Sequence, residues 1–325
     1  MNLISVEDNI VVFGSNGLAG RAICRSLKES GYKKILTPKR SELNLLNFEE
    51  VMKWFDIKRP NIVIIAAAKV GGIYANDIYS ADFILENLKI QNNIIENSWR
   101  KGVKKLLFLG SSCIYPKFAK QPISEEELLT SSLETSNQWY AIAKITGIKL
   151  CEALKKQYNF NAISLMPTNL YGPGDNYHPE NSHVLASLIR RFCEAKFRNK
   201  KEVVCWGSGS AFREFLHVDD LGSACVFALE KWDQDSLDAP KDINNKPLRF
   251  LNVGTGSDIS IKELANLIGK IVDFDGEIVW DLSKPDGTPK KQLNVSRINK
   301  MGWKSKISLE NGLRETIKNF QDNYI

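Results

Sequence analysis

Short apolar runs alternate with amphipathic stretches through the first half of the chain. Each run is almost continuously apolar and ends at glycine or polar residues, a pattern typical of strands buried on both faces of a parallel sheet. The stretches between them repeat apolar positions with the period of a helix. We therefore expect strands at 9–14, 34–37, 61–68, 105–110 and 161–166, separated by helices at 21–30, 49–57, 81–100 and 140–157.

The pattern changes after Pro167. Residues 169–182 are rich in Gly, Pro and Asn and are expected to be irregular. The remainder predicts helices at 183–197, 221–230, 261–272 and 309–323, strands at 203–206 and 249–253, a polar insert at 233–247 and a basic Pro/Gly-rich loop at 281–292. We predict an α/β fold in which a Rossmann-type, doubly wound parallel sheet occupies residues 1–168. A smaller substrate-binding α/β lobe occupies most of 169–325, and the chain crosses back to the first unit later.

Composition narrows the function classes. The 325 residues carry a net charge of +6 that is spread along the chain, with no run of basic residues interleaved with aromatic ones, so we expect no nucleic-acid binding. Nothing approaches the roughly 20 consecutive apolar residues that span a bilayer, and no signal peptide is visible. The six cysteines form no CxxC pair, which argues against a metal site and against a disulfide framework. We expect a cytoplasmic protein that binds no membrane.

A glycine-rich loop follows the first expected strand. Its GxxGxxG spacing would let backbone amides approach a pyrophosphate at the start of the next helix, through residues Gly14, Ser15, Asn16, Gly17, Leu18, Ala19 and Gly20. The second strand ends in Thr37-Pro38-Lys39-Arg40, without a carboxylate before Glu42. An arginine at this position suits a ribose 2′-phosphate, so we predict NADP(H) with Arg40 as the phosphate partner. The alternative is that Lys39 and Arg40 are solvated loop charges.

Tyr140 and Lys144 lie four residues apart, and Ser111 follows the fourth expected strand. On a helix these two side chains share a face, so the lysine can favour the anionic form of a phenol whose pKa is ordinarily near about 10. The serine hydroxyl would orient a substrate carbonyl beside the phenol. This set of groups is suited to carbonyl reduction. The alternative for an isolated YxxxK pair is ordinary surface packing.

Seven segments together resemble the GDP-L-fucose synthase family of the extended short-chain dehydrogenase/reductase superfamily. They cover nearly the whole chain: 66–73 (AAAKVGGI), 107–116 (LFLGSSCIYP), 140–150 (YAIAKITGIKL), 166–173 (MPTNLYGP), 181–184 (NSHV), 206–220 (WGSGSAFREFLHVDD) and 283–291 (SKPDGTPKK). The resemblance implies NADPH-dependent conversion of GDP-4-keto-6-deoxy-D-mannose to GDP-L-fucose, by epimerisation at C3 and C5 followed by reduction at C4. It also implies a homodimer.

The resemblance assigns roles to individual residues. Cys113 is the expected base and His183 the expected acid for epimerisation, beside the reductase set of Ser111, Tyr140 and Lys144. Implied cofactor contacts beyond the glycine loop and Arg40 are Leu109, Gly110, Ser111, Ser112, Lys144, Pro167, Thr168, Asn169, Leu170 and His183. Implied substrate contacts are Arg191, Trp206, Arg213 and Asp286. Lys290 and Lys291 are interpreted as solvated loop charges, and His178 and His217 as structural.

Two departures from the family and two rival interpretations remain. Asn16 stands where relatives often carry an arginine that helps hold the 2′-phosphate, and Trp139 replaces a smaller residue.

The first rival interpretation is a relative acting on another GDP-4-keto sugar, such as a deoxyheptose or a 3,6-dideoxy sugar precursor. The presence of both Cys113 and His183 argues against a member that only reduces. The second rival is a non-catalytic nucleotide-sugar or NADP-binding module, which intact catalytic positions disfavour.

Overall fold

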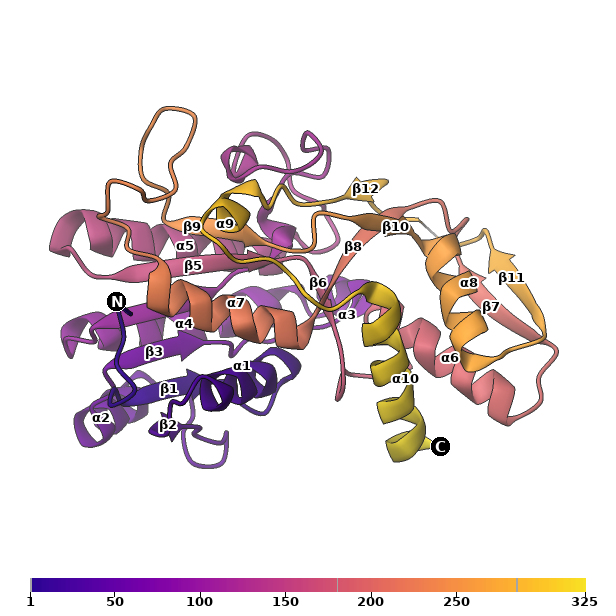
Figure 1. Cartoon of the computed structure of the whole chain (residues 1–325), viewed down its shortest axis with the longest axis horizontal. Coiled ribbons are helices and arrows are strands. Elements are labelled where there is room, and N and C mark those ends of the chain that lie inside the picture. The colour runs from indigo at the N-terminus through magenta and orange to yellow at the C-terminus, as the bar shows by residue number, and fades with distance from the viewer. Residues whose placement is uncertain (1, 180, 285) are drawn as a thin grey trace.

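The computed structural model describes residues 2–179, 181–284 and 286–325 (Figure 1). The expected irregular segment 169–182 and the expected loop 281–292 each contain one position, 180 and 285, that lies outside the described residues. None of the helices in the described ranges is long and apolar enough to cross a membrane.

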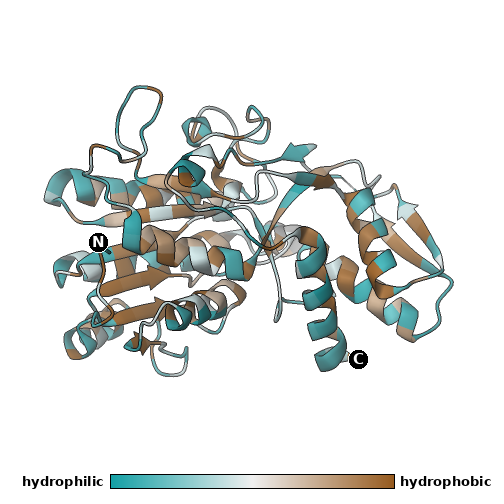
Figure 2. Cartoon of the chain, viewed as in Figure 1, coloured by the Kyte–Doolittle hydropathy of each residue, from teal (hydrophilic) through white to brown (hydrophobic). Residues whose placement is uncertain are grey.

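A six-stranded parallel sheet forms the larger part of the molecule. Its strand order is β2-β1-β3-β4-β5-β9. The chain adds β2 on one side of β1 and then β3 on the other side, so the order of strand addition changes sides at β1. The strands are β1 (Ile10–Phe13), β2 (Ile35–Leu36), β3 (Ile62–Ile65), β4 (Lys105–Leu109), β5 (Ala162–Pro167) and β9 (Phe250–Val253). Five of the six are buried along their whole length, and Figure 2 colours these strands mostly as hydrophobic. This confirms the predicted doubly wound α/β fold.

Helices cover the sheet in two layers (Figure 1). The helices α1 (Leu18–Glu29) and α7 (Val218–Lys231) pack along each other, and α4 (Ser80–Arg100) packs between α2 (Phe48–Lys58) and α5 (Gln138–Tyr158). The helix expected at 221–230 and the strand expected at 249–253 thus join the first unit as α7 and β9. The chain crosses back to complete the sheet.

The second unit is built from small sheets and three helices, with a hydrophobic core of its own. A four-stranded sheet contains β6 (Asn169–Tyr171), β8 (Phe212–His217), β10 (Asp258–Ser260) and β12 (Lys290–Lys291), and β7 (Glu202–Trp206) pairs with β11 (Glu277–Asp281). Its helices are α6 (Val184–Phe197), α8 (Ile261–Val272) and α10 (Leu309–Tyr324).

Several short elements differ from the sequence prediction. Strand β6 lies in the segment expected to be irregular, and β8, β10, β11 and β12 were not expected. These strands are short or partly exposed, so they lack the apolar run that identifies a buried strand; β12 is simply Lys-Lys. The short helices α3 (Ile73–Ile78) and α9 (Ser296–Lys300) and the 3-10 turns η1 (Ser112–Ile114) and η2 (Glu125–Glu127) were also missed.

A buried carboxylate joins the two units. The Glu214 side chain accepts hydrogen bonds from Leu293 N at 2.7 Å and Gly256 N at 2.8 Å, and burial raises its pKa. Its main-chain oxygen accepts from Thr168 Oγ1 at 3.1 Å and from Asn169 Nδ2 at 2.8 Å. The end of β5 is therefore fixed against β8, which sets the position of the second unit at the carboxyl edge of the sheet.

Candidate active site

The glycine loop is packed too tightly for side chains at two of its glycines. Gly14 has φ +85°, and a Cβ there would lie 2.5 Å from Ala67 N. A Cβ on Gly20 would lie 2.1 Å from Gly14 O. Helix α1 begins directly after Gly17, which has no side chain to cap it, so its first N–H groups are free to face an anion. The predicted turn and its helix N-terminus are thus both present.

Two further features fit this loop to a dinucleotide phosphate. The Ser15 hydroxyl is buried and has no hydrogen-bond partner within the described part of the chain. Arg21, which the sequence analysis missed, donates from Nη1 to Asn16 O at 2.8 Å and from Nη2 to Gly174 O at 2.5 Å. It fixes the loop to the segment that follows β6. A small loop of this shape with an unsatisfied hydroxyl suits a phosphate oxygen.

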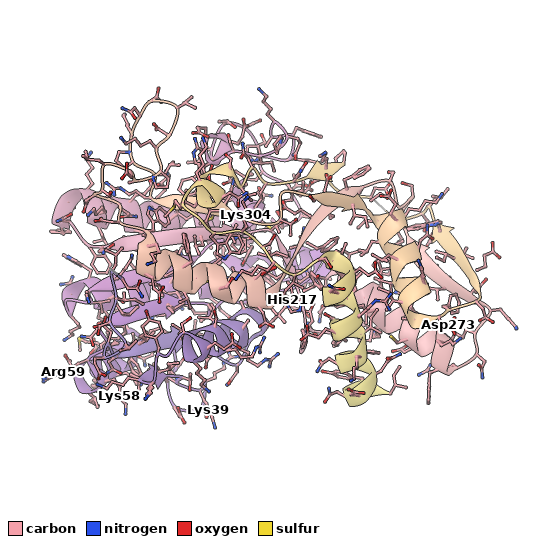
Figure 3. All side chains as sticks on the ribbon, viewed as in Figure 1. Lys39, Lys58, Arg59, His217, Asp273 and Lys304 are labelled. Carbon is pink, nitrogen blue, oxygen red and sulfur yellow. The ribbon has the colours of Figure 1, made fainter. Side chains whose placement is uncertain are left out.

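Arg40 lies in the exposed turn after β2. Because β2 pairs in parallel with β1, this turn and the glycine loop lie at the same edge of the sheet. The nearby carboxylate of Glu42 accepts a hydrogen bond from Lys39 N at 3.1 Å, so it closes the turn. In Figure 3 the Lys39 side chain points outward from the molecule. Arg40 is exposed at this edge of the sheet, on the same side as the glycine loop.

Ser111 and Tyr140 meet where β4 ends. The Ser111 side chain caps the 3-10 turn η1 by accepting from Cys113 N at 3.2 Å, and it lies close enough to Tyr140 on α5 to act on the pKa of the phenol. One turn further along α5, Lys144 places Nζ 5.7 Å from the centroid of the Tyr140 ring. The three side chains of the expected reductase set therefore lie together.

The electrostatics of this set differ from the sequence expectation. Burial raises the pKa of Tyr140 above its usual range; the charge of Cys113 adds to that rise and the Ser111 hydrogen bond opposes it. Burial also lowers the pKa of Lys144 to about 7. The Lys144 ammonium donates to Leu109 O at 2.8 Å and does not bond to the phenol. Desolvation of both groups therefore outweighs the attraction that we expected to lower the pKa of Tyr140.

Cys113 has two polar neighbours that the sequence did not reveal. Its Sγ accepts from Asn137 Nδ2 at 3.5 Å and from Lys291 Nζ at 3.7 Å. Asn137 lies three residues before Tyr140, a spacing that could have indicated it. Lys291 is distant in sequence, and its interpretation as a solvated loop charge is wrong. The guanidinium of Arg213 also interacts electrostatically with Cys113.

His183 approaches from the second unit, at the residue that precedes α6. Its side chain is exposed to water, yet protein surrounds it closely enough that burial lowers its pKa. The adjoining main chain is fixed because Gly72 N donates to Asn181 O at 3.2 Å. Among the described residues, no hydrogen bond or ion pair joins His183 to Cys113. His183 thus lies where the second unit contacts the loop that follows β3.

The expected substrate residues lie on the second unit. The Arg191 guanidinium lies 4.9 Å from the centroid of the Trp206 ring, and 56% of Trp206 is exposed. Asp286 accepts from Ser208 N at 2.7 Å and from Ser208 Oγ at 2.8 Å, so its carboxylate fixes the turn after β7. Burial lowers the pKa of Arg213, and the charges of Asp286 and Cys113 oppose that shift. Arg213 therefore lies within electrostatic range of both Asp286 and Cys113.

His217 is structural, as predicted. It is buried, caps the start of α7 by accepting from Asp219 N at 3.3 Å, and packs against Tyr171. Ligand atoms of His217, Asp219 and Glu315 lie within 4.8 Å of one another, a spacing that a metal ion could use. Arg25 already donates to Asp219 Oδ1 at 2.5 Å, however, so that carboxylate is engaged in an ion pair.

Comparison with known proteins decides the family. Residues 10–244 match the model of the NAD dependent epimerase/dehydratase family. The chain is 50% identical to a GDP-L-fucose synthase of Escherichia coli (strain K12), with 98% of each chain covered. The chain belongs to the GDP-L-fucose synthase family. GDP-L-fucose synthase 1 of Arabidopsis thaliana is 53% identical over 94% of this chain and 91% of that one.

A solved structure extends the likeness to three dimensions. A GDP-mannoheptose C4 reductase from Campylobacter jejuni, solved with NADP bound, has a TM-score of 0.86 at 35% identity, covering 98% of this chain and 99% of that one. The family and the fold that the seven segments indicated are thereby confirmed.

Proposed function

We propose that this chain converts GDP-4-keto-6-deoxy-D-mannose to GDP-L-fucose, first inverting C3 and C5 and then reducing C4 with NADPH. One observation carries the proposal. Cys113, Ser111 and Tyr140 lie together at the carboxyl end of β4, which places the proposed base and the proposed proton donor in one site. A nucleotide-sugar partner, and no nucleic acid or metal, follows from this assignment.

The residues around this point fit NADP(H). Gly14 to Gly20 would hold the pyrophosphate, Arg40 the 2′-phosphate, and Lys144 the nicotinamide ribose. Leu109 to Ser112, Pro167 to Leu170, and His183 would surround the nicotinamide. When bound, NADPH supplies the hydride that reduces C4. The chain's own contribution is to bind, orient and exchange protons.

Reduction at C4 needs a proton for the alkoxide that forms. Tyr140 is the proposed donor, and because burial raises its pKa, the phenol is protonated at neutral pH. Ser111 donates a hydrogen bond to the same oxygen. Lys144, when charged, stabilises the phenolate that remains, since its Nζ lies 5.7 Å from the Tyr140 ring centroid.

Epimerisation uses the acidity of C3 and C5, both of which flank the C4 ketone. We assign Cys113 as the base that removes a proton and His183 as the acid that returns one to the opposite face. Burial lowers the pKa of His183, so its imidazolium gives up a proton readily. Arg191, Trp206, Arg213 and Asp286 are proposed to hold the GDP end, with arginine suited to a diphosphate.

Other assignments rest on the family and on the sequence. We propose a cytoplasmic homodimer in which α4 and α5, which pack together, provide the interface. Residues 1–168 are proposed as the cofactor domain and 169–325 mainly as the GDP-sugar lobe, with α7 and β9 returning to the first.

The pH dependence of reduction should reflect Lys144. Its pKa of about 7 means that the free protein loses this charge as the pH rises through neutrality. We expect kcat/KM for reduction of the epimerised 4-keto sugar to fall above about pH 7, because the uncharged amine no longer stabilises the Tyr140 phenolate. In Lys144→Arg the guanidinium stays charged, so this decline should disappear between pH 6 and about 9 even though the maximal rate is lower. An unchanged decline in Lys144→Arg would assign it to another group.

The proposed function is tested by incubating the protein with GDP-4-keto-6-deoxy-D-mannose and NADPH in deuterated water. NMR of the product should show GDP-L-fucose with deuterium at C3 and C5. Cofactor oxidation without deuterium at either carbon would instead indicate a C4 reductase for another GDP-4-keto sugar; the Campylobacter jejuni relative is named as a GDP-mannoheptose C4 reductase. If the product carries no deuterium and no cofactor is oxidised, the chain would be a non-catalytic binding module.

A further inference from the structure

The sulfur of Cys113 lies close to two nitrogen donors. Lys291 Nζ lies 3.7 Å from Sγ, and Asn137 Nδ2 lies 3.5 Å from it. Lys291 and Cys113 are both half-buried, so their interaction is screened less than that of a surface pair. An ammonium and an N–H donor both stabilise negative charge on a neighbouring sulfur atom.

Lys291 is held in this position by its main chain. It pairs with Arg213 in the β12–β8 register. On its two flanks, Gln121 Nε2 donates to Lys290 O at 3.1 Å and Gln121 Oε1 accepts from Gln292 N at 3.0 Å. Gln121 lies eight residues after Cys113, so the segment that carries the cysteine also fixes the lysine. Lys291 is therefore no freely solvated loop charge.

The adjacent lysine serves a different purpose. Lys290 Nζ pairs with Asp258 Oδ2 at 3.2 Å and lies 5.9 Å from the Phe212 ring centroid. Successive side chains of a strand point to opposite faces, so only one of the two lysines can face the cysteine. The pair thus provides a matched comparison at equal net charge.

We propose that Lys291 is a positioning residue for epimerisation, stabilising the thiolate of Cys113 that removes the proton at C3 and at C5. This inference rests on the proposed function. At each carbon the C–H bond breaks, an S–H bond forms on Cys113, and the electron pair moves to the C4 carbonyl oxygen as an enolate. His183 then forms the new C–H bond on the opposite face. Proton exchange with solvent restores the Cys113 thiolate and the His183 imidazolium.

The test first measures the rate at which the Cys113 thiol is alkylated, in the absence of substrate. Lys291→Met, Lys290→Met and Lys291→Arg are treated with iodoacetamide at pH 7, and modification is followed by mass spectrometry at Cys113 and at the half-buried Cys24, an internal control. We expect Lys291→Met to slow alkylation of Cys113 about tenfold, because the variant removes the ammonium that lies 3.7 Å from the reacting sulfur. Lys290→Met should match the wild type, Lys291→Arg should restore most of the rate, and Cys24 should react equally in all four proteins.

The second readout is deuterium exchange at C3 and C5, measured beside C4 reduction. Lys291→Met should lower kcat for exchange by about the same factor as alkylation, with KM and C4 reduction little changed. A rise in KM alone, with alkylation unchanged, would overturn the inference and place the lysine at the diphosphate. Absence of exchange in the wild type would instead refute the proposed function. Wild-type exchange with unaltered Cys113 alkylation in Lys291→Met would refute only the role of Lys291.

Discussion

Replacing Cys113 with serine is expected to abolish epimerisation while sparing reduction. Deuterium incorporation at C3 and C5 should fall by roughly 10²–10⁴-fold, the usual contribution of a general base. The hydroxyl that replaces the thiol is similar in size and can still accept from Asn137 and Lys291, so the local structure should persist. Unlike a thiol, however, a hydroxyl does not ionise near neutral pH.

The C4 reaction should survive because Ser111, Tyr140 and Lys144 are untouched. Cys113→Ser should still oxidise NADPH with the 4-keto sugar and give the product reduced at C4 without inversion at C3 and C5. The control is Cys24→Ser, at a half-buried cysteine on α1, which should retain both activities. Equal loss of exchange and reduction in Cys113→Ser would contradict the division of roles between Cys113 and Tyr140.

The sequence was informative wherever chemistry depends on short spacing. The strands β1, β3, β4 and β5 are buried along their whole length. Each therefore has the almost continuous apolar run by which a buried strand is identified in a sequence. Tyr140 and Lys144 share a helix turn, and the glycine loop joins one strand to the next helix. In these places local sequence and tertiary structure agree, and the fold and the proximity of Tyr140 to Lys144 could be predicted.

The sequence was uninformative where contacts between distant parts of the chain determine the neighbours or the pKa of a side chain. The contact between Lys291 and Cys113 joins positions 178 residues apart, through a two-residue strand composed only of lysines. Arg21 likewise reaches Gly174 across the chain. The pKa directions of Tyr140 and Lys144 also depend on burial, which residue spacing does not report. Spacing alone therefore overestimated the effect of the lysine on the phenol.

Replacing Tyr140 with phenylalanine should produce the opposite separation of activities. The ring keeps its volume and its packing on α5, and only the proton donor to the C4 alkoxide is lost. We expect NADPH oxidation to fall by roughly 10²–10⁴-fold, the usual contribution of general acid catalysis. Exchange at C3 and C5 should continue, because Cys113 and its two nitrogen donors are unchanged. The epimerised 4-keto sugar should then accumulate and be detectable by NMR.

Tyr158→Phe is the matched control, at the last residue of the same helix, where the side chain is 49% exposed. It should retain both reactions. Loss of exchange together with reduction in Tyr140→Phe would show that the phenol also polarises the ketone for proton removal. The two variants therefore test one idea from both directions: a single C4 carbonyl acidifies the protons that Cys113 removes and then accepts the proton that Tyr140 donates. Only a site with two separable proton-transfer groups gives exchange without reduction in one variant and reduction without exchange in the other.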